Sequence, residues 1–321
     1  MKSMLLKAAM LGVIGFALPV VQVQAIEPYE YAKPSDMTTK ALILDVAEIG
    51  SRLVAVGEFG HIIYSDDRGE TWVQARDVPT RNTITDITFT DDKVGFAAGH
   101  DATILKTEDG GESWMLKYIE RRGENPLFGL DFSGPDYGIA VGAFSTVMET
   151  KDGGETWTQR PLVEGGYDDF HLNGLFSDAA GNMYIPAEFG VVYKSTDGGR
   201  TFEGIQPPYE GSFWGGLPLA NGDLLIWGMR GNAYVSKDGA RSWLRSETNT
   251  DRSISGGTQL ADGRVVLTGL SGLVLSSTED GGNFEAYVRP DRLSFATVSS
   301  KSDSEVLLYG DPGVLPHAIA N

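Results

Sequence analysis

The residues of this sequence that could do chemistry are arginines and acids in the polar stretches between short apolar runs. Arg81, Arg122, Arg252 and Arg292 stand in four different stretches. If they converged, they could grip a carboxylate. Hydrolysis of an acidic sugar would also need an activated tyrosine and a second acid. No Tyr–Glu pairing stands out, so hydrolysis stays an alternative hypothesis.

Metal and cofactor chemistry finds little support in the sequence. The four histidines are His61, His100, His171 and His317. The stretch "DDFH" (168–171) comes nearest to a ligand set, but its spacing suits a solvated loop better than a known metal site. No phosphate-binding loop, dinucleotide fingerprint or serine nucleophile motif occurs. We therefore expect no metal and no cofactor.

The arginines are concentrated in a few stretches of the chain. Stretches 74–83, 119–127, 159–171, 205–214, 245–253 and 287–293 hold nine of the 15 arginines and no lysine. Arginine without lysine favours bidentate pairing or stacking over diffuse attraction. These arginines could bind a partner, or they could simply pair with the acids beside them.

A repeat of about 42 residues determines where those stretches lie. The box "TEDGGESW" (107–114) has relatives that end at Trp72, Trp157, Phe202, Trp243 and Phe284. A second series, from "VGEFG" (56–60) to "YGDPG" (309–313), keeps the same spacing and has seven members. Periods of this length are typical of four-stranded propeller blades.

The strand-like pattern within each unit completes the fold prediction. Unit 2 shows it in "TITDITF" (83–89), "VGFAAG" (94–99), "ATILKT" (102–107) and "WMLKYI" (114–119), with turn residues between. We predict an all-β, seven-bladed β-propeller of four-stranded antiparallel blades. The seventh unit ends without a box or fourth strand, so we expect "PYEYA" (28–32) to close the ring as that strand.

Each box is expected to be a structural turn. Its aspartate can accept bonds from the turn backbone, its glycines allow positive φ, and its aromatic residue pins the turn. Six copies with one invariant acid make poor calcium cages. The predicted box residues are Asp67, Trp72, Asp109, Trp114, Asp152, Trp157, Asp197, Phe202, Asp238 and Trp243.

An antiparallel meander places all boxes on one face and the arginine stretches on the other. Phe59, Phe144 and Phe189 share one turn position on that second face. Aromatic and arginine side chains together are typical of protein-binding surfaces. We therefore predict a partner-binding face made of Arg81, Arg121, Arg122, Arg230, Arg252, Arg292, Phe59, Phe144, Phe189 and Trp214.

The N-terminal segment and the composition of the sequence suggest a cellular compartment. Residues 1–25 have a basic start, an apolar run and "VQA" before the expected cleavage site, as a secretory signal peptide does. Residues 26–321 then form one propeller domain, with 26–40 serving the closing strand. A net charge of −18 argues against binding nucleic acid or anionic membranes. We expect a periplasmic monomer without membrane insertion after cleavage.

The boxes resemble the Asp-box, or bacterial neuraminidase, repeat. The longer stretches "AVGEFGHIIYSDDRGETW" (55–72) and "AVGAFSTVMETKDGGETW" (140–157) are similar to the photosystem II assembly-factor family. Cyanobacterial members carry a lipidation cysteine, and this chain has no cysteine. The resemblance implies a non-photosynthetic, secreted relative with an arginine-bearing face. We expect a non-enzymatic scaffold or accessory partner of an envelope membrane-protein complex, such as an exporter. The alternative is a sialidase-like hydrolase or a glycan-binding propeller.

Overall fold

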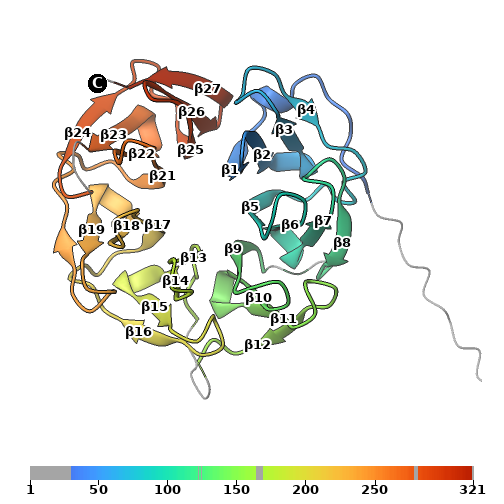
Figure 1. Cartoon of the computed structure of the whole chain (residues 1–321), viewed down its shortest axis with the longest axis horizontal. Helices are drawn as coiled ribbons and strands as arrows, with labels where there is room; N and C mark the ends of the chain where they lie inside the picture. The colour runs from blue at the N-terminus through green and yellow to red at the C-terminus, as the bar shows by residue number, and fades with distance from the viewer. Residues whose placement is uncertain (1–29, 122, 124, 164–168, 278–280, 320–321) are drawn as a thin grey trace, which may run out of the picture.

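Seven antiparallel sheets stand side by side around a central channel (Figure 1). The computed structural model describes residues 30–121, 123, 125–163, 169–277 and 281–319. The predicted signal peptide, residues 1–25, lies outside this range. The seven antiparallel sheets confirm the predicted all-β, seven-bladed propeller.

Six of the sheets have four described strands, which follow chain order from the axis outward. Blade 1 contains β1 (Ile43–Ile49), β2 (Arg52–Gly57), β3 (Ile62–Ser65) and β4 (Val73–Gln74). Blade 2 contains β5 (Ile84–Phe89), β6 (Gly95–Gly99), β7 (Ile104–Thr107) and β8 (Met115–Tyr118). Blade 3 contains β9 (Leu127–Phe132), β10 (Gly138–Gly142), β11 (Val147–Thr150) and β12 (Thr158–Arg160).

The next three blades repeat this order. Blade 4 contains β13 (Phe176–Ser177), β14 (Met183–Pro186), β15 (Val192–Ser195) and β16 (Glu203–Ile205). Blade 5 contains β17 (Phe213–Pro218), β18 (Leu224–Gly228), β19 (Ala233–Ser236) and β20 (Leu244–Arg245). Blade 6 contains β21 (Ile254–Gln259), β22 (Val265–Gly269), β23 (Leu273–Ser277) and β24 (Phe284–Val288).

The seventh blade differs from the prediction at its outer edge. It contains β25 (Phe295–Ser302), β26 (Glu305–Gly310) and β27 (Gly313–Ala318), and no described strand pairs with the outer edge of β27. Residues 30–32 of the expected closing strand lie on blade 1, where the Ala32 amide donates to the Val78 carbonyl at 2.9 Å. Pro28 and Tyr29 are outside the described residues. The ring is closed by packing between Leu307 and Tyr309 of β26 and Ile43 of blade 1.

Burial explains why the second strand of each blade is so apolar. All five residues of β6, β10, β18 and β22 are buried, because a neighbouring blade covers each face of the sheet. The apolar clusters lie between blades, and one of them joins Val54 and Ile62 of blade 1 to Ile84 and Leu105 of blade 2. The central channel is therefore held by blade-to-blade packing.

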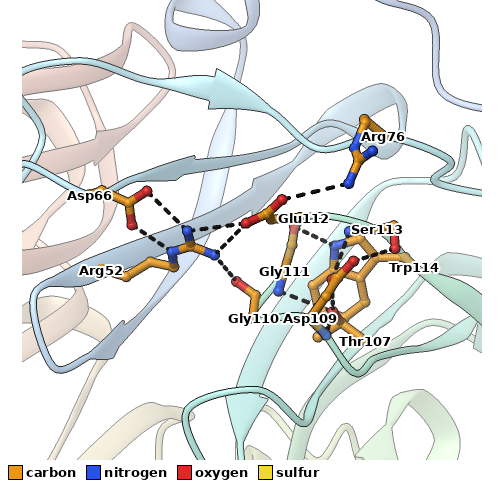
Figure 2. A network of polar contacts seen from close by, with 10 residues as sticks. All are labelled: Arg52, Asp66, Arg76, Thr107, Asp109, Gly110, Gly111, Glu112, Ser113 and Trp114. Carbon is orange, nitrogen blue, oxygen red and sulfur yellow. Dashed lines mark hydrogen bonds and ion pairs between the residues drawn. The ribbon is translucent and has the colours of Figure 1, made fainter.

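Each box forms a closed hydrogen-bonded turn, as Asp109 illustrates (Figure 2). Its carboxylate accepts the Ser113 amide at 2.9 Å, the Ser113 hydroxyl at 2.6 Å and the Thr107 hydroxyl at 2.8 Å. Asp67, Asp152, Asp197 and Asp238 accept the amide four residues later in the same way. Hydrogen bonds from the hydroxyl and then the amide of Thr156 lower the pKa of Asp152 to about 2.

The boxes also fasten each blade to the one before it. The Arg76 amide at the end of the outer strand of blade 1 donates to the Glu112 carbonyl of the second box at 2.7 Å. The Glu247 amide donates to the Gly282 carbonyl of the sixth box at 2.9 Å. Trp114, Trp157, Phe202 and Trp243 are buried, whereas Trp72 is partly buried and packs edge-on against Tyr309 of blade 7. The boxes are thus inter-blade joints as well as turns.

Seven short 3-10 turns are the only helical elements among the described residues. They are η1 (Thr38–Lys40), η2 (Glu58–Gly60), η3 (His100–Ala102), η4 (Ala143–Ser145), η5 (Glu188–Gly190), η6 (Met229–Gly231) and η7 (Leu270–Gly272). Within the part of the chain that the structure describes, no helix is long and apolar enough to cross a bilayer. Turns η2 to η7 join the second and third strands of blades 1 to 6.

Candidate functional site: a face of strained turn tips

Each of the turns η2 to η7 places two consecutive residues at positive φ, and in all six the first of them is not glycine. In η2 the chain turns because the His61 amide donates to the Glu58 carbonyl at 3.0 Å. Gly60 has φ +70°, and a Cβ there would lie 2.2 Å from the Thr80 carbonyl oxygen. The residue before it, Phe59, has φ 58°. The corresponding positions are Asp101, Phe144, Phe189, Arg230 and Ser271, all with φ between 53° and 58°.

Three of these tips carry phenylalanines that are neither buried nor conformationally favoured. Phe59, Phe144 and Phe189 are 53%, 51% and 61% exposed. A bulky residue at positive φ costs about 1–2 kcal/mol relative to the right-handed region. Burial does not offset this cost here, and glycine or asparagine would avoid it. Exposed strain of this kind makes these tips candidates for a functional role.

Two of these phenylalanines belong to one aromatic patch over blades 3 and 4. The Phe144 ring lies 5.0 Å from the His171 ring, edge to face. The backbone amide of Phe144 donates to His171 Nδ1 at 3.2 Å. The Phe189 ring lies 5.1 Å from Phe170. The backbone of Phe170 is tied to Ser145, whose amide donates to the Phe170 carbonyl at 2.7 Å. We call Phe144, Phe170, His171 and Phe189 the aromatic patch.

An arginine cluster lies on the same face over blades 5 to 7. Arg230 is an exposed tip residue, and its amide donates to Ser253 Oγ at 3.3 Å, beside Arg252 in the chain. Arg292 is exposed with φ 58°, and its Cα packs against Gly272 of η7. No described acid forms an ion pair with Arg230, Arg252 or Arg292 within 4.0 Å. We call Arg230, Arg252 and Arg292, which lie on successive connections of blades 5 to 7, the arginine cluster.

Most of the remaining arginines of these stretches form ion pairs, as the structural interpretation of the sequence predicts. Arg81 is paired with Glu30 at 3.0 Å. Arg76, Arg160 and Arg289 pair with Glu112, Glu149 and Asp291 at 3.6, 3.2 and 2.6 Å, so acids nearby account for them. Arg121 is exposed, and Arg122 lies outside the described residues.

Trp214 occupies a different place from the other predicted residues. It lines the central channel, a cavity of about 400 Å³, together with Phe128. Each is the second residue of the inner strand of its blade, where the pairing with the second strand shifts register. The corresponding Thr85 and Ser255 hydroxyls donate to the carbonyls of Leu127 and Phe295 in the next blade, each at 2.5 Å. These positions form the channel mouth beneath the turn tips.

Three aspartates in the channel wall are functional candidates that sequence reasoning missed. Asp45 accepts the Ile87 amide at 3.1 Å, and Asp86 accepts the Leu130 amide at 2.7 Å. Asp131 accepts the Ser177 hydroxyl at 2.5 Å. Each bond joins one blade to the next. The sequence did contain a clue to two of them. At the inner-strand position that Asp45 and Asp86 occupy in blades 1 and 2, blades 3 to 6 have glycine.

Burial governs the protonation of these channel acids. Burial raises the pKa of Asp45 to about 7, although backbone amides of Val46 and Ile87 oppose the change. Burial and then the neighbouring Asp45 charge raise the pKa of Asp86 well above its usual value. Burial also raises the pKa of Asp131. The Asp45–Asp86 pair therefore holds at least one proton near neutral pH.

The channel does not assemble the groups that the sialidase-like alternative requires. Its described lining contains aspartates, small residues and apolar side chains, but no arginine and no tyrosine. Phe59, Phe144 and Phe189 stay on the turn tips outside this lining. Among the described residues, no group of three or more histidines and acids could hold a metal ion.

These features define a class of protein: a seven-bladed propeller with Asp-box turns. The family model for photosynthesis system II assembly factor YCF48 matches residues 74–126 and 118–300, and that for the BNR/Asp-box repeat matches residues 63–74. The chain belongs to the YCF48 family. No curated protein matches the sequence.

Solved structures share the fold at low sequence identity. YCF48 bound to D1 peptide is 18% identical with a TM-score of 0.70, covering 95% of this chain and 100% of that one. YCF48 from Cyanidioschyzon merolae is 15% identical with a TM-score of 0.67, covering 90% and 98%. Virginiamycin B lyase from Staphylococcus aureus is 9% identical with a TM-score of 0.71, covering 87% and 95%. An enzyme and an assembly factor thus share this architecture, so the fold alone does not give the function.

Proposed function

We propose that this propeller binds an exposed segment of an envelope membrane protein through its turn-tip face and has no catalytic role. The observation that carries the proposal is the set of exposed phenylalanines held at positive φ. Maintaining them costs stability, and about half or more of each side chain stays exposed even though Phe144 and Phe189 pack on neighbouring rings, which favours a use outside the folded chain. Aromatic and arginine side chains are those that dominate the energy of protein interfaces.

The two parts of the face suit different features of a partner segment. The aromatic patch offers apolar ring surface over blades 3 and 4. The arginine cluster offers guanidinium groups for carboxylates or backbone carbonyls over blades 5 to 7. The solved structure of YCF48 with a D1 peptide supports a peptide-binding role in this family. The role proposed here is that of an assembly or accessory factor for a membrane-protein complex, such as an exporter.

A periplasmic location goes with this proposal. The signal-like residues 1–25 and the absence of cysteine suit export without a lipid anchor. The mature protein purified from its own cells should then begin at Ile26, and intact-mass measurement tests this. A chain that retains residues 1–25 in the cytoplasmic fraction would contradict it.

Affinity capture with matched variants tests the binding face. The variant Phe59→Ala/Phe144→Ala/Phe189→Ala and the variant Arg230→Ala/Arg252→Ala/Arg292→Ala should each lose capture of the partner from a solubilised envelope fraction. Their melting temperatures should stay close to that of the parent chain. Leu244→Ala is the matched control, because Leu244 is 63% exposed on the outer strand β20. Equal capture by the parent chain and both triple variants would sink the proposal.

A further inference from the structure

The open edge of blade 7 is the one place where the blade pattern is incomplete among the described residues. In blades 1 to 6 a fourth strand pairs with the third strand, whereas β27 pairs only with β26. A cleft of about 590 Å³ runs between β24 and β27, lined by Val274, Tyr287, His317 and Ile319. The Tyr287 and His317 rings stack there at 5.4 Å. An unpaired edge beside an apolar cleft can accept an extended segment.

The segment expected at this edge is held elsewhere by few contacts. Residues 30–35, which we call the strap, lie on blade 1. One backbone hydrogen bond joins Ala32 to Val78, and the Gln74 side chain contacts the backbone of Lys33 and Ser35, each at 2.9 Å. Glu30 pairs with Arg81, and its side chain is 75% exposed. Tyr31 is 53% exposed, so this dock leaves its large apolar ring largely in water.

The chain that follows the strap is anchored beside β27. A Cβ on Gly313, the first residue of β27, would lie 1.9 Å from the Thr39 carbonyl oxygen in η1. The strap therefore ends within a few residues of the open edge. Strand β1 begins eight residues after Ser35, and β25 begins seven residues after the end of β24. The connection is long enough for the strap to take the place of a fourth strand.

We propose that the strap exchanges between two docks, the blade 1 surface and the open edge of β27. On β27 it runs antiparallel as the fourth strand of blade 7, and Tyr31 covers the cleft beside Tyr287. The exchange breaks the Glu30–Arg81 pair, the Ala32–Val78 backbone bond and the two Gln74 bonds, and it gains backbone bonds along β27. It needs no partner. The exchange releases Arg81 from Glu30. The use of the released arginine in partner binding rests on the proposed function.

Cross-linking measures both docks in one molecule, because the chain has no cysteine of its own. The variant Ala32→Cys/Asp77→Cys/Pro316→Cys, which uses the exposed Asp77 beside the buried Val78, is treated with a short bismaleimide, and mass spectrometry quantifies the two linked products. We expect both products. Adding Arg81→Ala should raise the ratio of the β27 product to the blade 1 product about twofold to fivefold, the range expected for loss of an exposed ion pair. Arg292→Ala is the matched control and should leave the ratio unchanged.

Either missing product overturns the proposal. The strap has one fixed position if only the blade 1 link forms in both backgrounds, or if only the β27 link forms. Hydrogen exchange on the cysteine-free chain gives an independent measurement. The amides of Val314 and Ala318, which face the open edge of β27, should exchange more slowly in the Arg81→Ala variant than in the parent chain. Equal exchange rates in the two chains would also overturn it.

Discussion

Arg52 of the first blade donates a hydrogen bond of 3.1 Å to the carbonyl of Gly110 in the second blade (Figure 2). The same guanidinium holds Asp66 through two bonds of 2.6 and 2.9 Å and lies 3.4 Å from Glu112. Its carbon stands 4.7 Å from the centre of the Tyr64 ring. One side chain thus joins the first box region to the second.

We predict that Arg52→Ala lowers the free energy of unfolding by about 1–2 kcal/mol, because a planar, charge-assisted junction is lost. Arg52→Lys should recover less than half of the loss, since an ammonium cannot bind Asp66 and Gly110 in the same plane. Urea unfolding followed by tryptophan fluorescence measures both. Arg68→Ala is the control, because Arg68 is exposed on the same turn. If Arg68→Ala costs as much as Arg52→Ala, the junction has no special role.

Asp109 gives the matching prediction for the box itself. Asp109→Ala removes three hydrogen bonds within the turn and should lower stability by about 1 kcal/mol or more. Glu108→Ala, one residue earlier and 58% exposed, should cost far less. Partner capture should fall only as far as folding does. Loss of capture by a fully stable Asp109→Ala protein would falsify the structural role of the box.

The repeat made the blade order predictable, because the boxes and the turn series fix the period independently. The exposed position of Phe59, Phe144 and Phe189 on equivalent turns also follows from that period. Their strain does not, since a left-handed φ depends on the close approach of Gly60 to Thr80 across the blade. The position of the strap was not predictable either. Whether this strand-like segment lies beside Val78 or along β27 depends on tertiary contacts, which no local sequence pattern encodes.

The channel acids show a second limit of sequence reasoning. Asp45 and Asp86 sit in strands that also expose polar residues, so each aspartate looks like an ordinary surface acid. Only the ring geometry brings the inner strands of blades 1 and 2 together and links Asp45 to the Ile87 amide. Trp214 likewise falls in a predicted connection, yet a register shift at the start of β17 turns it to the channel.

The tip phenylalanines should trade stability for binding. Phe189→Asn places a residue that tolerates positive φ at an exposed position, so its free energy of unfolding should be unchanged or higher by about 0.5–1 kcal/mol. Partner capture should weaken, because the aromatic patch loses a ring. Leu244→Asn, in extended strand β20, should show the opposite pair of effects: slightly lower stability and normal capture. A Phe189→Asn protein with lower stability would mean that its ring supports the fold.

The protonation of Asp45 and Asp86 predicts an unusual dependence of stability on pH. Their pKa values are raised in the folded chain, so the native state binds more protons than the unfolded state between about pH 4 and 7. Stability from this pair is therefore fully present below the unfolded pKa and falls as pH rises through the folded value of about 7 for Asp45. The box aspartates behave oppositely. Asp152, with its pKa lowered to about 2, contributes stability above pH 4 that is lost on acidification.

Asp45→Asn isolates the channel contribution from that of the boxes. The amide oxygen can still accept the Ile87 amide, but it carries no charge at any pH. We expect the stability advantage of the variant over the parent chain to grow by about 1 kcal/mol or more from pH 4 to pH 8, because one pKa unit corresponds to about 1.4 kcal/mol. Urea unfolding between pH 4 and 9 gives the difference curve. Asp131→Asn should show a smaller effect of the same sign. If the difference in unfolding free energy between the variant and the parent chain did not change with pH, Asp45 would not be the residue that carries the proton of the pair.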